Sequence, residues 1–325
     1  MRAIRVHQFG DPSVLRLEEV PTPMPGQGQV QIRVQAAGVN PVDTYIRSGR
    51  YGALPTPPFI PGSDGAGTIA ALGAGVSRWK VGDRVFFHGT ALGGPYGAYA
   101  EVAVCDQDTV YRLPAKMGFS EGAALGVPYA TAYQALMVKA RPKPNEIVLV
   151  HGASGGVGTA ALQLARWKGL RVIGTAGSPD GLELVKANGA HLAISHKEAL
   201  YVDVIREAAD HGRGPDIILE MLANVNLDSD LDLVARGGRI VVIGNRGKIE
   251  IDPRKIMAKD AAILGVMLWN QTKEELAAIY ADLTAGVEQG ALVPVIGQEV
   301  PLADAARAHD AVMTPGAYGK IVLLP

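Results

Sequence analysis

The chain has 325 residues, of which 48% are hydrophobic and 19% are charged, and its formal net charge at pH 7 is -1. This balance supplies apolar material for two cores and argues against intrinsic disorder, which needs low hydrophobicity and high net charge. It also provides no broad positive field, so the composition argues against nucleic acid as a main partner.

The cysteine count and the N-terminal segment narrow the class further. The single cysteine, Cys105, excludes an intramolecular disulfide and a multi-thiolate zinc site. Asp11, Glu18 and Glu19 interrupt the first apolar run, so no signal peptide is expected. No stretch reaches the roughly 20 apolar residues that a membrane span needs. These features predict a cytoplasmic protein without a membrane partner.

The first 120 residues are expected to be rich in β-strands. Residues 30–34 alternate between apolar and polar side chains, which is typical of a half-buried strand. Prolines and glycines punctuate residues 21–26 and 55–62, and Gly82 lies in a turn before an apolar run at 84–87. Short strands joined by tight turns predict a β-rich first domain.

From about residue 120 to residue 266, predicted strands and helices alternate. Most of the strand candidates are continuous runs rich in Val and Ile, as in a parallel sheet that is buried on both faces. This alternation predicts a doubly wound α/β domain. The expected strands are Ile147–His151, Arg171–Thr175, His191–Ser195, Asp216–Glu220, Arg239–Ile243 and Ala262–Val266, with helices such as Gly156–Lys168 and Gly181–Asn188.

The tail is expected to add two helices, Lys273–Gln289 and Leu302–Met313, and a final strand at Lys320–Leu324. That strand has no partner signal inside the α/β region, so we expect it to return to the β-rich domain. The expected division is a β-rich catalytic domain at 1–122, the dinucleotide-binding domain at 123–266, and a segment returning to the first domain at 267–325.

The most informative stretch is 148–158, where a strand leads into a glycine cluster that a helix follows. Glycines permit a tight turn and a close approach to a pyrophosphate, and the helix N-terminus offers free N–H groups to the anion. Ala153 stands where the fingerprint has its first glycine, so the match alone is weak. The surrounding strand, helix and βα units nevertheless favour a dinucleotide site over an ordinary glycine-rich turn.

The end of the second strand bears on the choice between NAD and NADP. NAD enzymes usually carry an acidic residue there, about 20 residues past the loop, to bind the ribose 2′-OH. Here Ala176 and Gly177 end the strand, and no carboxylate occurs before Asp180. This absence permits NADPH, although no Lys or Arg stands in that turn to select the 2′-phosphate. Arg246, in a later loop, is either that group or an ordinary solvated charge.

A family resemblance rests on motifs at residues 37–49, 61–64, 80–85, 150–158, 220–227 and 319–320. Through them nearly the whole chain resembles the zinc-free medium-chain dehydrogenases/reductases, specifically the quinone oxidoreductases of the zeta-crystallin type. The resemblance implies a GroES-like catalytic domain interrupted by a Rossmann domain, with the last segment returning to the first domain. It also implies a homodimer or homotetramer that pairs across the last Rossmann strand, near Ala262–Leu268.

The same resemblance implies an enzyme without a metal. Zinc-dependent relatives place a cysteine at the position of Asn40, a histidine at Ser63 and a second cysteine near Val127, and these ligands are gone here. The seven histidines are spread over separate elements, without the i, i+4 spacing of a metal pair, and an isolated histidine is more often structural than a metal ligand.

The resemblance also assigns roles to single residues. Tyr45 is implied to lie near the nicotinamide, unless it packs as a core tyrosine. Asn40, Asp43 and Tyr129 are expected to line the acceptor site with Tyr45, although Asn40 and Asp43 can instead cap a turn. The implied NADPH contacts are Tyr45, Thr131, Ser154, Gly155, Gly156, Val157, Gly177, His196, Asn226, Ile243, Gly244, Asn245, Arg246, Val266, Met267 and Leu268.

The implied reaction is NADPH-dependent reduction of a quinone, with hydride passing directly between rings that the protein aligns. An enone or alkenal reductase with the same fold and cofactor is an alternative, for which Tyr45 is the candidate proton donor. An NADPH-binding structural or RNA-binding protein of the crystallin type is an alternative of another class. No basic or aromatic-striped segment favours RNA.

Overall fold

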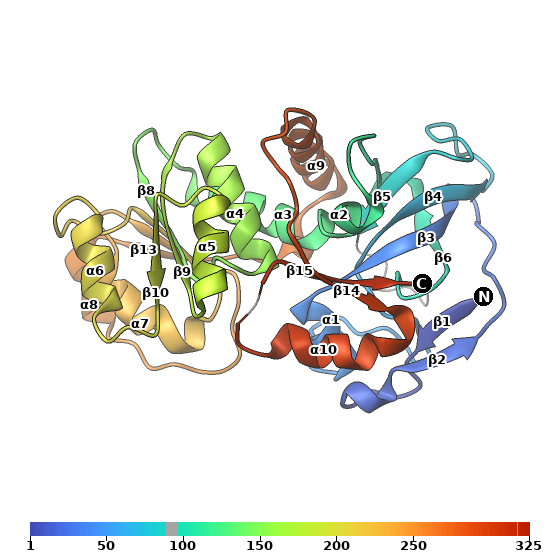
Figure 1. Ribbon diagram of the computed structural model, residues 1–325, viewed down its shortest axis with the longest axis horizontal. Coiled ribbons are helices and arrows are strands. Elements are labelled where there is room, and N and C mark those ends of the chain that lie inside the picture. Colours follow the sequence, from blue (N-terminus) through green and yellow to red (C-terminus); the bar gives the residue numbers. More distant parts are fainter. Residues whose placement is uncertain (89–96, 317) are drawn as a thin grey trace. The chain divides into compact units, whose positions relative to one another are not determined.

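The computed structural model describes residues 1–88, 97–316 and 318–325, which form two compact units (Figure 1). The first unit comprises Met1–Val127, Pro294–Thr314 and Gly319–Pro325, and the second comprises Pro128–Val293 and Pro315–Tyr318. Among the described residues, no helix combines the length and apolar character that crossing a membrane requires.

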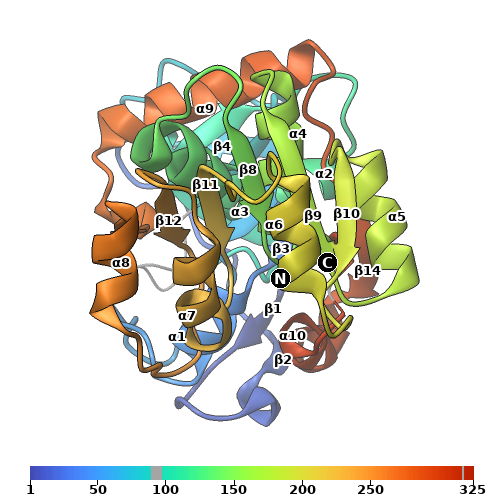
Figure 2. The ribbon, with the colours of Figure 1, turned by 90° about the vertical axis from the view of Figure 1, so that its left-hand side faces the viewer.

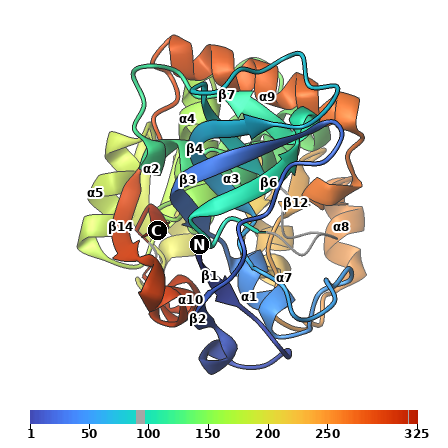
Figure 3. The ribbon, with the colours of Figure 1, turned by 90° about the vertical axis from the view of Figure 1, so that its right-hand side faces the viewer.

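The first unit is built on a sheet whose described strands run in the order β14-β15-β3-β4-β5-β7, with β6 also paired to β3 (Figure 3). Strands β14 and β15 are parallel and the other pairs are antiparallel. Strands β1 and β2 form a separate antiparallel pair. The strands of this unit are β1 (Arg2–Arg5), β2 (Arg16–Glu19), β3 (Gln29–Val39), β4 (Asp64–Leu72), β5 (Arg84–His88), β6 (Val102–Asp106), β7 (Val110–Arg112), β14 (Ile296–Pro301) and β15 (Lys320–Leu324).

The core of the first unit lies against the long strand β3. Val30, Ile32 and Val34 alternate along β3 and are buried together with Tyr99 and Phe87. This is the period-2 pattern that the sequence predicts for residues 30–34. The final strand, β15, pairs antiparallel with β3, so the C-terminus lies in the sheet of this unit. Its helices are α1 (Pro41–Arg47), α2 (Phe119–Ala123) and α10 (Ala305–Met313), with short 3-10 turns at Pro12–Val14, Gln107–Thr109 and Leu302–Asp304.

The second unit contains a sheet of six parallel strands in the order β10-β9-β8-β11-β12-β13 (Figure 2). Numbered from β8, this is the 3-2-1-4-5-6 order of a Rossmann fold, which confirms the predicted doubly wound domain. Each predicted strand agrees with the structure to within one residue at either end. The strands are β8 (Ile147–Val150), β9 (Arg171–Ala176), β10 (Leu192–Ser195), β11 (Ile217–Glu220), β12 (Arg239–Val242) and β13 (Ala262–Gly265).

Helices cover both faces of this sheet. On one face, Leu162 of α4 and Val185 of α5 lie against Gly174 of β9. On the other face, Ile205 of α6 and Leu231 of α7 share a core with the strands. The helices are α3 (Gly126–Tyr133), the π-helical segment Gln134–Ala140, α4 (Gly156–Trp167), α5 (Pro179–Ala187), α6 (Tyr201–Ala208), α7 (Ala223–Leu233), α8 (Pro253–Lys259), the 3-10 turn Leu268–Asn270, and α9 (Lys273–Glu288).

Two boundaries differ from the expectation, and the smaller difference is that the first unit extends to Val127 instead of residue 122. The returning segment was expected to begin at residue 267, but α9 belongs to the second unit and the return begins at Pro294. The reason is that α9 packs beside the first helices of that unit. Asp282 accepts a hydrogen bond of 2.7 Å from the Tyr133 hydroxyl, and Gln289 accepts one of 3.2 Å from the Trp167 ring N–H.

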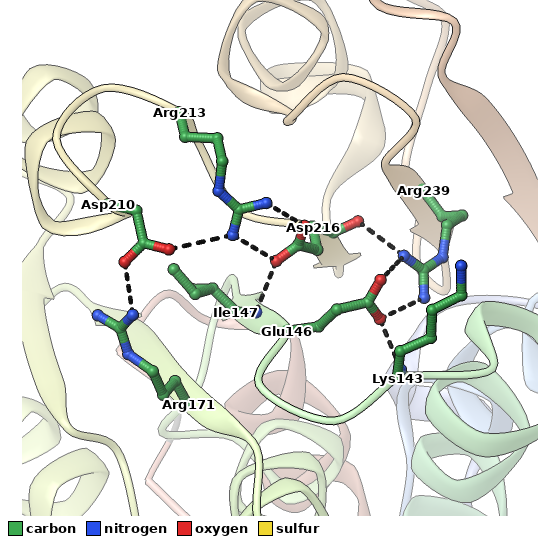
Figure 4. A network of polar contacts seen from close by, with 8 residues as sticks. All are labelled: Lys143, Glu146, Ile147, Arg171, Asp210, Arg213, Asp216 and Arg239. Atoms are coloured by element: carbon green, nitrogen blue, oxygen red, sulfur yellow. Dashed lines mark hydrogen bonds and ion pairs between the residues drawn. The ribbon is translucent and has the colours of Figure 1, made fainter.

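The amino ends of the parallel strands are fixed by a network of ion pairs, shown in Figure 4. Arg213 binds Asp216 through both guanidinium nitrogens, at 2.6 and 3.0 Å, and Asp216 also accepts from the Ile147 backbone N–H at 2.8 Å. Arg239 binds both oxygens of Glu146, at 2.9 and 2.8 Å. Further along, Arg171 pairs with Asp210, which Arg213 also contacts.

Candidate functional site

The glycine loop lies at the carboxyl end of β8 and leads into α4. Gly152 has φ +56°, a conformation that favours glycine, and turns the chain back toward the helix. A Cβ on Gly158 would lie 2.4 Å from the Gly152 carbonyl oxygen and 2.6 Å from Ala153 Cα, so only glycine lets the helix pack this close. Gly155 is the N-cap and has no side-chain capping bond, which leaves the first N–H groups of α4 for an anion.

Ala153 explains why the fingerprint tolerates a missing glycine. Its side chain is buried, and its backbone N–H donates to the Thr175 carbonyl at 2.8 Å, which joins the loop to the end of β9. The Ala153 methyl lies beside Gly174, where an added Cβ would be only 3.0 Å away. Gly174 on the neighbouring strand therefore leaves room for the Ala153 methyl, so the loop does not need a glycine at position 153.

Two basic side chains lie beside the end of the second strand. A Cβ on Gly177 would be 2.7 Å from His196 Nε2 and 3.4 Å from Lys197 Cε, so both residues, which follow β10, border this turn. Burial and the charges of His151 and Lys197 lower the pKa of His196. Lys197 was missed in the sequence, which showed no cation in the turn itself. The adjacency of β9 and β10 in a Rossmann sheet is the signal that would have found it.

The turns after β11 and β12 are joined to each other. The Ala223 backbone N–H donates to the Gly244 carbonyl at 3.0 Å, and the Arg246 backbone N–H donates to the Asn224 side chain at 2.8 Å. Gly244 lies directly against the Met221 backbone, where a Cβ would be 2.2 Å from its carbonyl oxygen. The structure thus brings together Asn226 and the predicted contacts Ile243, Gly244, Asn245 and Arg246 at the carboxyl ends of two adjacent strands.

The remaining predicted contacts of the second unit come from two segments. Val266 continues from β13, and its N–H donates to the Val242 carbonyl at 3.1 Å, while Met267 and Leu268 follow it. Thr131 and Tyr129 lie on α3 and are both buried. The Tyr129 hydroxyl donates to Gln163 of α4 at 2.7 Å, so Tyr129 holds two helices together instead of presenting its hydroxyl at the protein surface.

In the first unit, the residues expected to line an acceptor site divide into two groups. Tyr45 of α1 is partly exposed, whereas Asn40 and Asp43 are buried. Asp43 accepts hydrogen bonds from the Asn40 N–H at 2.8 Å, from the Ser63 hydroxyl at 2.7 Å and from Tyr99 at 3.4 Å. Burial raises the pKa of Asp43 to about 6, although the hydrogen bonds from Ser63 and Asn40 oppose it. The Asp43 carboxylate thus caps the start of α1 by accepting from the Asn40 N–H, which is the capping alternative that the sequence left open. A role of Asn40 and Asp43 in lining an acceptor site stays a prediction.

A buried lysine completes this polar cluster. Lys320 Nζ contacts the Asn40 side-chain oxygen, and lies 3.3 Å from an Asp64 oxygen. Asn40 Nδ2 donates to the same Asp64 carboxylate at 2.9 Å, and Asp64 also accepts from the Val127 N–H at 2.8 Å. Burial raises the pKa of Asp64 and lowers that of Lys320, while their mutual attraction opposes both shifts. Local sequence patterns do not indicate this pairing, because its members are far apart along the chain.

Comparison with known proteins agrees with both halves of the fold. A family model described as zinc-binding dehydrogenase matches residues 156–284, and one described as alcohol dehydrogenase GroES-like domain matches residues 26–115. A quinone oxidoreductase of Mus musculus is 53% identical over 327 residues, which covers 100% of this chain and 98% of that protein. The chain belongs to the quinone oxidoreductases of the zeta-crystallin type.

Solved structures show the same fold over the full length. A quinone oxidoreductase of Escherichia coli complexed with NADPH has a TM-score of 0.88 and 31% identity, with 100% of each chain covered. An NAD-dependent alcohol dehydrogenase has a TM-score of 0.93 and 28% identity, also with 100% of each chain covered. The fold is therefore shared by proteins whose names differ in both cofactor and substrate.

The residues of this chain do not fit the zinc that one family description names. At two positions where zinc-dependent relatives carry ligands, Asn40 and Ser63 both use their side chains as hydrogen-bond donors to carboxylates. The Lys320 ammonium group lies against Asn40 and Asp64, so a cation of the protein itself already balances the acid. Zinc is bound by thiolate, imidazole or carboxylate ligands. The carboxylates of this cluster, Asp43 and Asp64, instead accept hydrogen bonds from Ser63, Asn40 and Lys320.

Proposed function

We propose that this protein catalyses the NADPH-dependent reduction of quinones. The observation that carries the proposal is 53% identity to a quinone oxidoreductase along the entire chain. The NADPH complex of the Escherichia coli relative supports the choice of cofactor. The residues at the end of β9, Ala176 and Gly177, are not acidic, and His196 and Lys197 border Gly177, which is consistent with a ligand that carries a 2′-phosphate.

The residues of the second unit fit this cofactor. Ser154–Val157 would hold the pyrophosphate with backbone N–H groups, and Lys197 and His196 would bind the 2′-phosphate. The turns at Asn226, Ile243–Arg246 and Val266–Leu268, with Thr131 and Gly177, would contact the rest of the molecule. When bound, NADPH supplies a hydride, and the protein contributes position and the exclusion of water.

Tyr45 is the residue of the first unit that we propose as a contact of the reacting rings, because its side chain is partly exposed. Asn40 and Asp43 would act through it by fixing the start of α1. If Tyr45 only positions a ring, Tyr45→Ala should lower kcat/KM about tenfold without abolishing turnover. Tyr45→Phe should keep most of the activity, since no proton transfer from the hydroxyl would be needed.

We also propose that two copies pair through β13. This strand lies at the edge of the parallel sheet, and its residues are only partly buried in the single chain. An uncovered edge strand offers unpaired backbone groups to a second copy. Size-exclusion chromatography with light scattering would measure the oligomer directly.

The experiment that tests the proposed reaction is NADPH consumption with a simple quinone beside a simple enone. We expect turnover with the quinone, and a lower kcat/KM with NADH than with NADPH. Turnover of the enone alone would replace the quinone assignment by an enone reductase. The loss of all activity in the Tyr45→Phe variant, with cofactor binding intact, would point to a required proton donor instead.

A further inference from the structure

A buried cluster of titratable groups lies at the carboxyl edge of the parallel sheet, apart from the proposed cofactor contacts. His151 follows β8, Glu220 ends β11, and Asp230 lies on α7. One nitrogen or oxygen atom from each of the three lies within 4.8 Å of the other two, and no residue of the three is more than 4% exposed. Strands β8 and β11 are the neighbours at which the strand order reverses, where a Rossmann fold binds its dinucleotide.

The cluster contains two carboxyl groups but one imidazole. His151 Nε2 lies 2.9 Å from an Asp230 oxygen and 3.7 Å from Glu220 Oε2, and its Nδ1 lies 3.4 Å from the Thr175 hydroxyl. Glu220 Oε2 and Asp230 Oδ2 are buried without a hydrogen-bond donor among the described residues. Two buried carboxylates beside one imidazolium would leave an unbalanced negative charge, which is costly away from water.

A proton on one carboxyl group removes this imbalance, because the protonated group becomes a donor to the other. Burial and the neighbouring Asp230 raise the pKa of Glu220 to about 7, against the opposing effect of His151. Burial alone would lower the pKa of His151, but its hydrogen bond to Asp230 and the two acidic charges outweigh burial and raise it. Two further titratable groups interact with the cluster, His196 through His151 and Tyr201 through both acids.

The cluster is also joined to the turns that surround the proposed cofactor. His151 immediately precedes Gly152 of the glycine loop. Glu220 Oε1 accepts hydrogen bonds from the Leu222 N–H and from Asn226 Nδ2, the latter at 3.2 Å. A change in the charge of this cluster therefore changes the electrostatic potential at the loop that would hold the pyrophosphate.

We propose that His151, Glu220 and Asp230 share one extra proton, and that its release to solvent places a negative charge beside the glycine loop and weakens the binding of NADPH. The effect on NADPH rests on the proposed function, whereas the shared proton does not. His151, Glu220 and Asp230 are positioning residues in this account, because they act on the cofactor through the loop and the turn at Asn226.

The test compares the dissociation constant of NADPH between pH 6 and pH 9 in the unmodified protein and in Glu220→Gln. The glutamine keeps the oxygen that accepts from Leu222 and Asn226, and its amide donates to Asp230 at every pH. We expect the Kd of the unmodified protein to rise about three- to tenfold more over this range than that of Glu220→Gln. The titration of the 2′-phosphate is common to both proteins and cancels in the comparison.

Glu207→Gln is the matched control, because Glu207 is exposed on α6 and should keep the profile of the unmodified protein. A second readout, without cofactor, is the melting temperature as a function of pH. A raised pKa in the folded state stabilises the protein below the ordinary pKa of glutamate, and this stabilisation is lost as pH rises through about 7. Glu220→Gln should therefore gain in melting temperature relative to the unmodified protein between pH 5 and pH 8.

Parallel profiles of the two proteins in both readouts would overturn the proposal. One divalent cation per chain by elemental analysis, lost together with stability in chelator, would also overturn it by assigning the cluster to a metal. If no variant binds NADPH at any pH, the proposed cofactor is wrong, and the melting profiles alone decide whether the proton is shared.

Discussion

At the amino ends of the parallel strands, each carboxylate in the network of Figure 4 faces an arginine, whereas at the carboxyl ends two buried carboxyl groups face one imidazole. The amino-edge side chains are partly open to water, from 11% to 50% exposed. The cluster at the carboxyl edge, which comprises His151, Glu220 and Asp230, is buried throughout. Both edges belong to one sheet, so the two edges differ in burial and in the balance of charge and not in the type of strand.

Balanced charge near water favours a fixed protonation state. At the amino edge, burial opposes ionisation of Glu146, but the hydrogen bonds and charge of Arg239 prevail and lower the pKa of Glu146. At the carboxyl edge, the pKa of Glu220 is raised because burial is not balanced by a second cation. The comparison predicts that amino-edge substitutions change stability alone, whereas carboxyl-edge substitutions change ligand binding.

The largest effect is expected for Gly158→Ala at the carboxyl edge. The new methyl would meet backbone atoms of Gly152 and Ala153, which cannot move without displacing the glycine loop. We expect the Kd for NADPH to rise about a hundredfold and the free energy of unfolding to fall by about 1–3 kcal/mol. Fluorescence titration and urea unfolding measure the two quantities. Gly52→Ala, where the methyl meets open space, should change neither, and a normal Kd in Gly158→Ala would contradict the proposed loop contact.

At the amino edge, Arg239→Met should lower the free energy of unfolding by about 2 kcal/mol and leave the Kd for NADPH within about twofold. The substitution leaves Glu146, whose side chain is 15% exposed, without its partner, and removes two hydrogen bonds to the Ala140 carbonyl. Arg236→Met is the matched control, because its pair with Asp260 is 83% and 66% exposed and should contribute under about 1 kcal/mol. A large change in the Kd for NADPH in Arg239→Met would contradict the prediction that amino-edge substitutions change stability alone.

The sequence predicted what depends on local pattern. Strands such as Ile147–Val150 are continuous apolar runs, and the loop before Gly156 carries its own glycines, so both were found without tertiary information. The boundary at residue 267 was misplaced because the amphipathic helix Lys273–Glu288 does not reveal which unit it packs against. Only contacts such as Tyr133 with Asp282 decide that question.

The parts of the site that the sequence did not predict are made by strand order and by distant pairing. The sequence favours a structural role for His151, because its acidic neighbours are about 70 and 80 positions away and meet it only through the adjacency of β8 and β11. Lys197 likewise follows a different strand from the turn it borders. Lys320 was noted within a motif, but nothing local indicated that it pairs with Asp64.

A smaller effect is expected for Lys197→Ala, which tests charge outside the buried cluster. Loss of one charge-assisted contact with the 2′-phosphate should raise the Kd for NADPH about tenfold and leave that for NADH within about twofold. Lys186→Ala, an exposed lysine in the last turn of α5, controls for the general loss of positive charge. Equal losses for both cofactors would show that Lys197 acts on something other than the 2′-phosphate.

The smallest effect, and the one that separates the edges by salt, is expected for Arg171→Gln. Arg171 and Asp210 lie 2.5 Å apart but are 50% and 42% exposed, so water and mobile ions screen their attraction. The substitution should lower the free energy of unfolding slightly in low salt, and by almost nothing at about 1 M salt, where the Debye length is near 3 Å. The stability difference between Glu220→Gln and the unmodified protein should persist in the same salt, because ions cannot enter the buried cluster.

Urea unfolding of both variants at the two salt concentrations measures these differences at constant pH. Equal salt dependence at Arg171 and Glu220 would show that the carboxyl-edge cluster is open to solvent, and the contrast between the two edges would then be one of composition and not of burial.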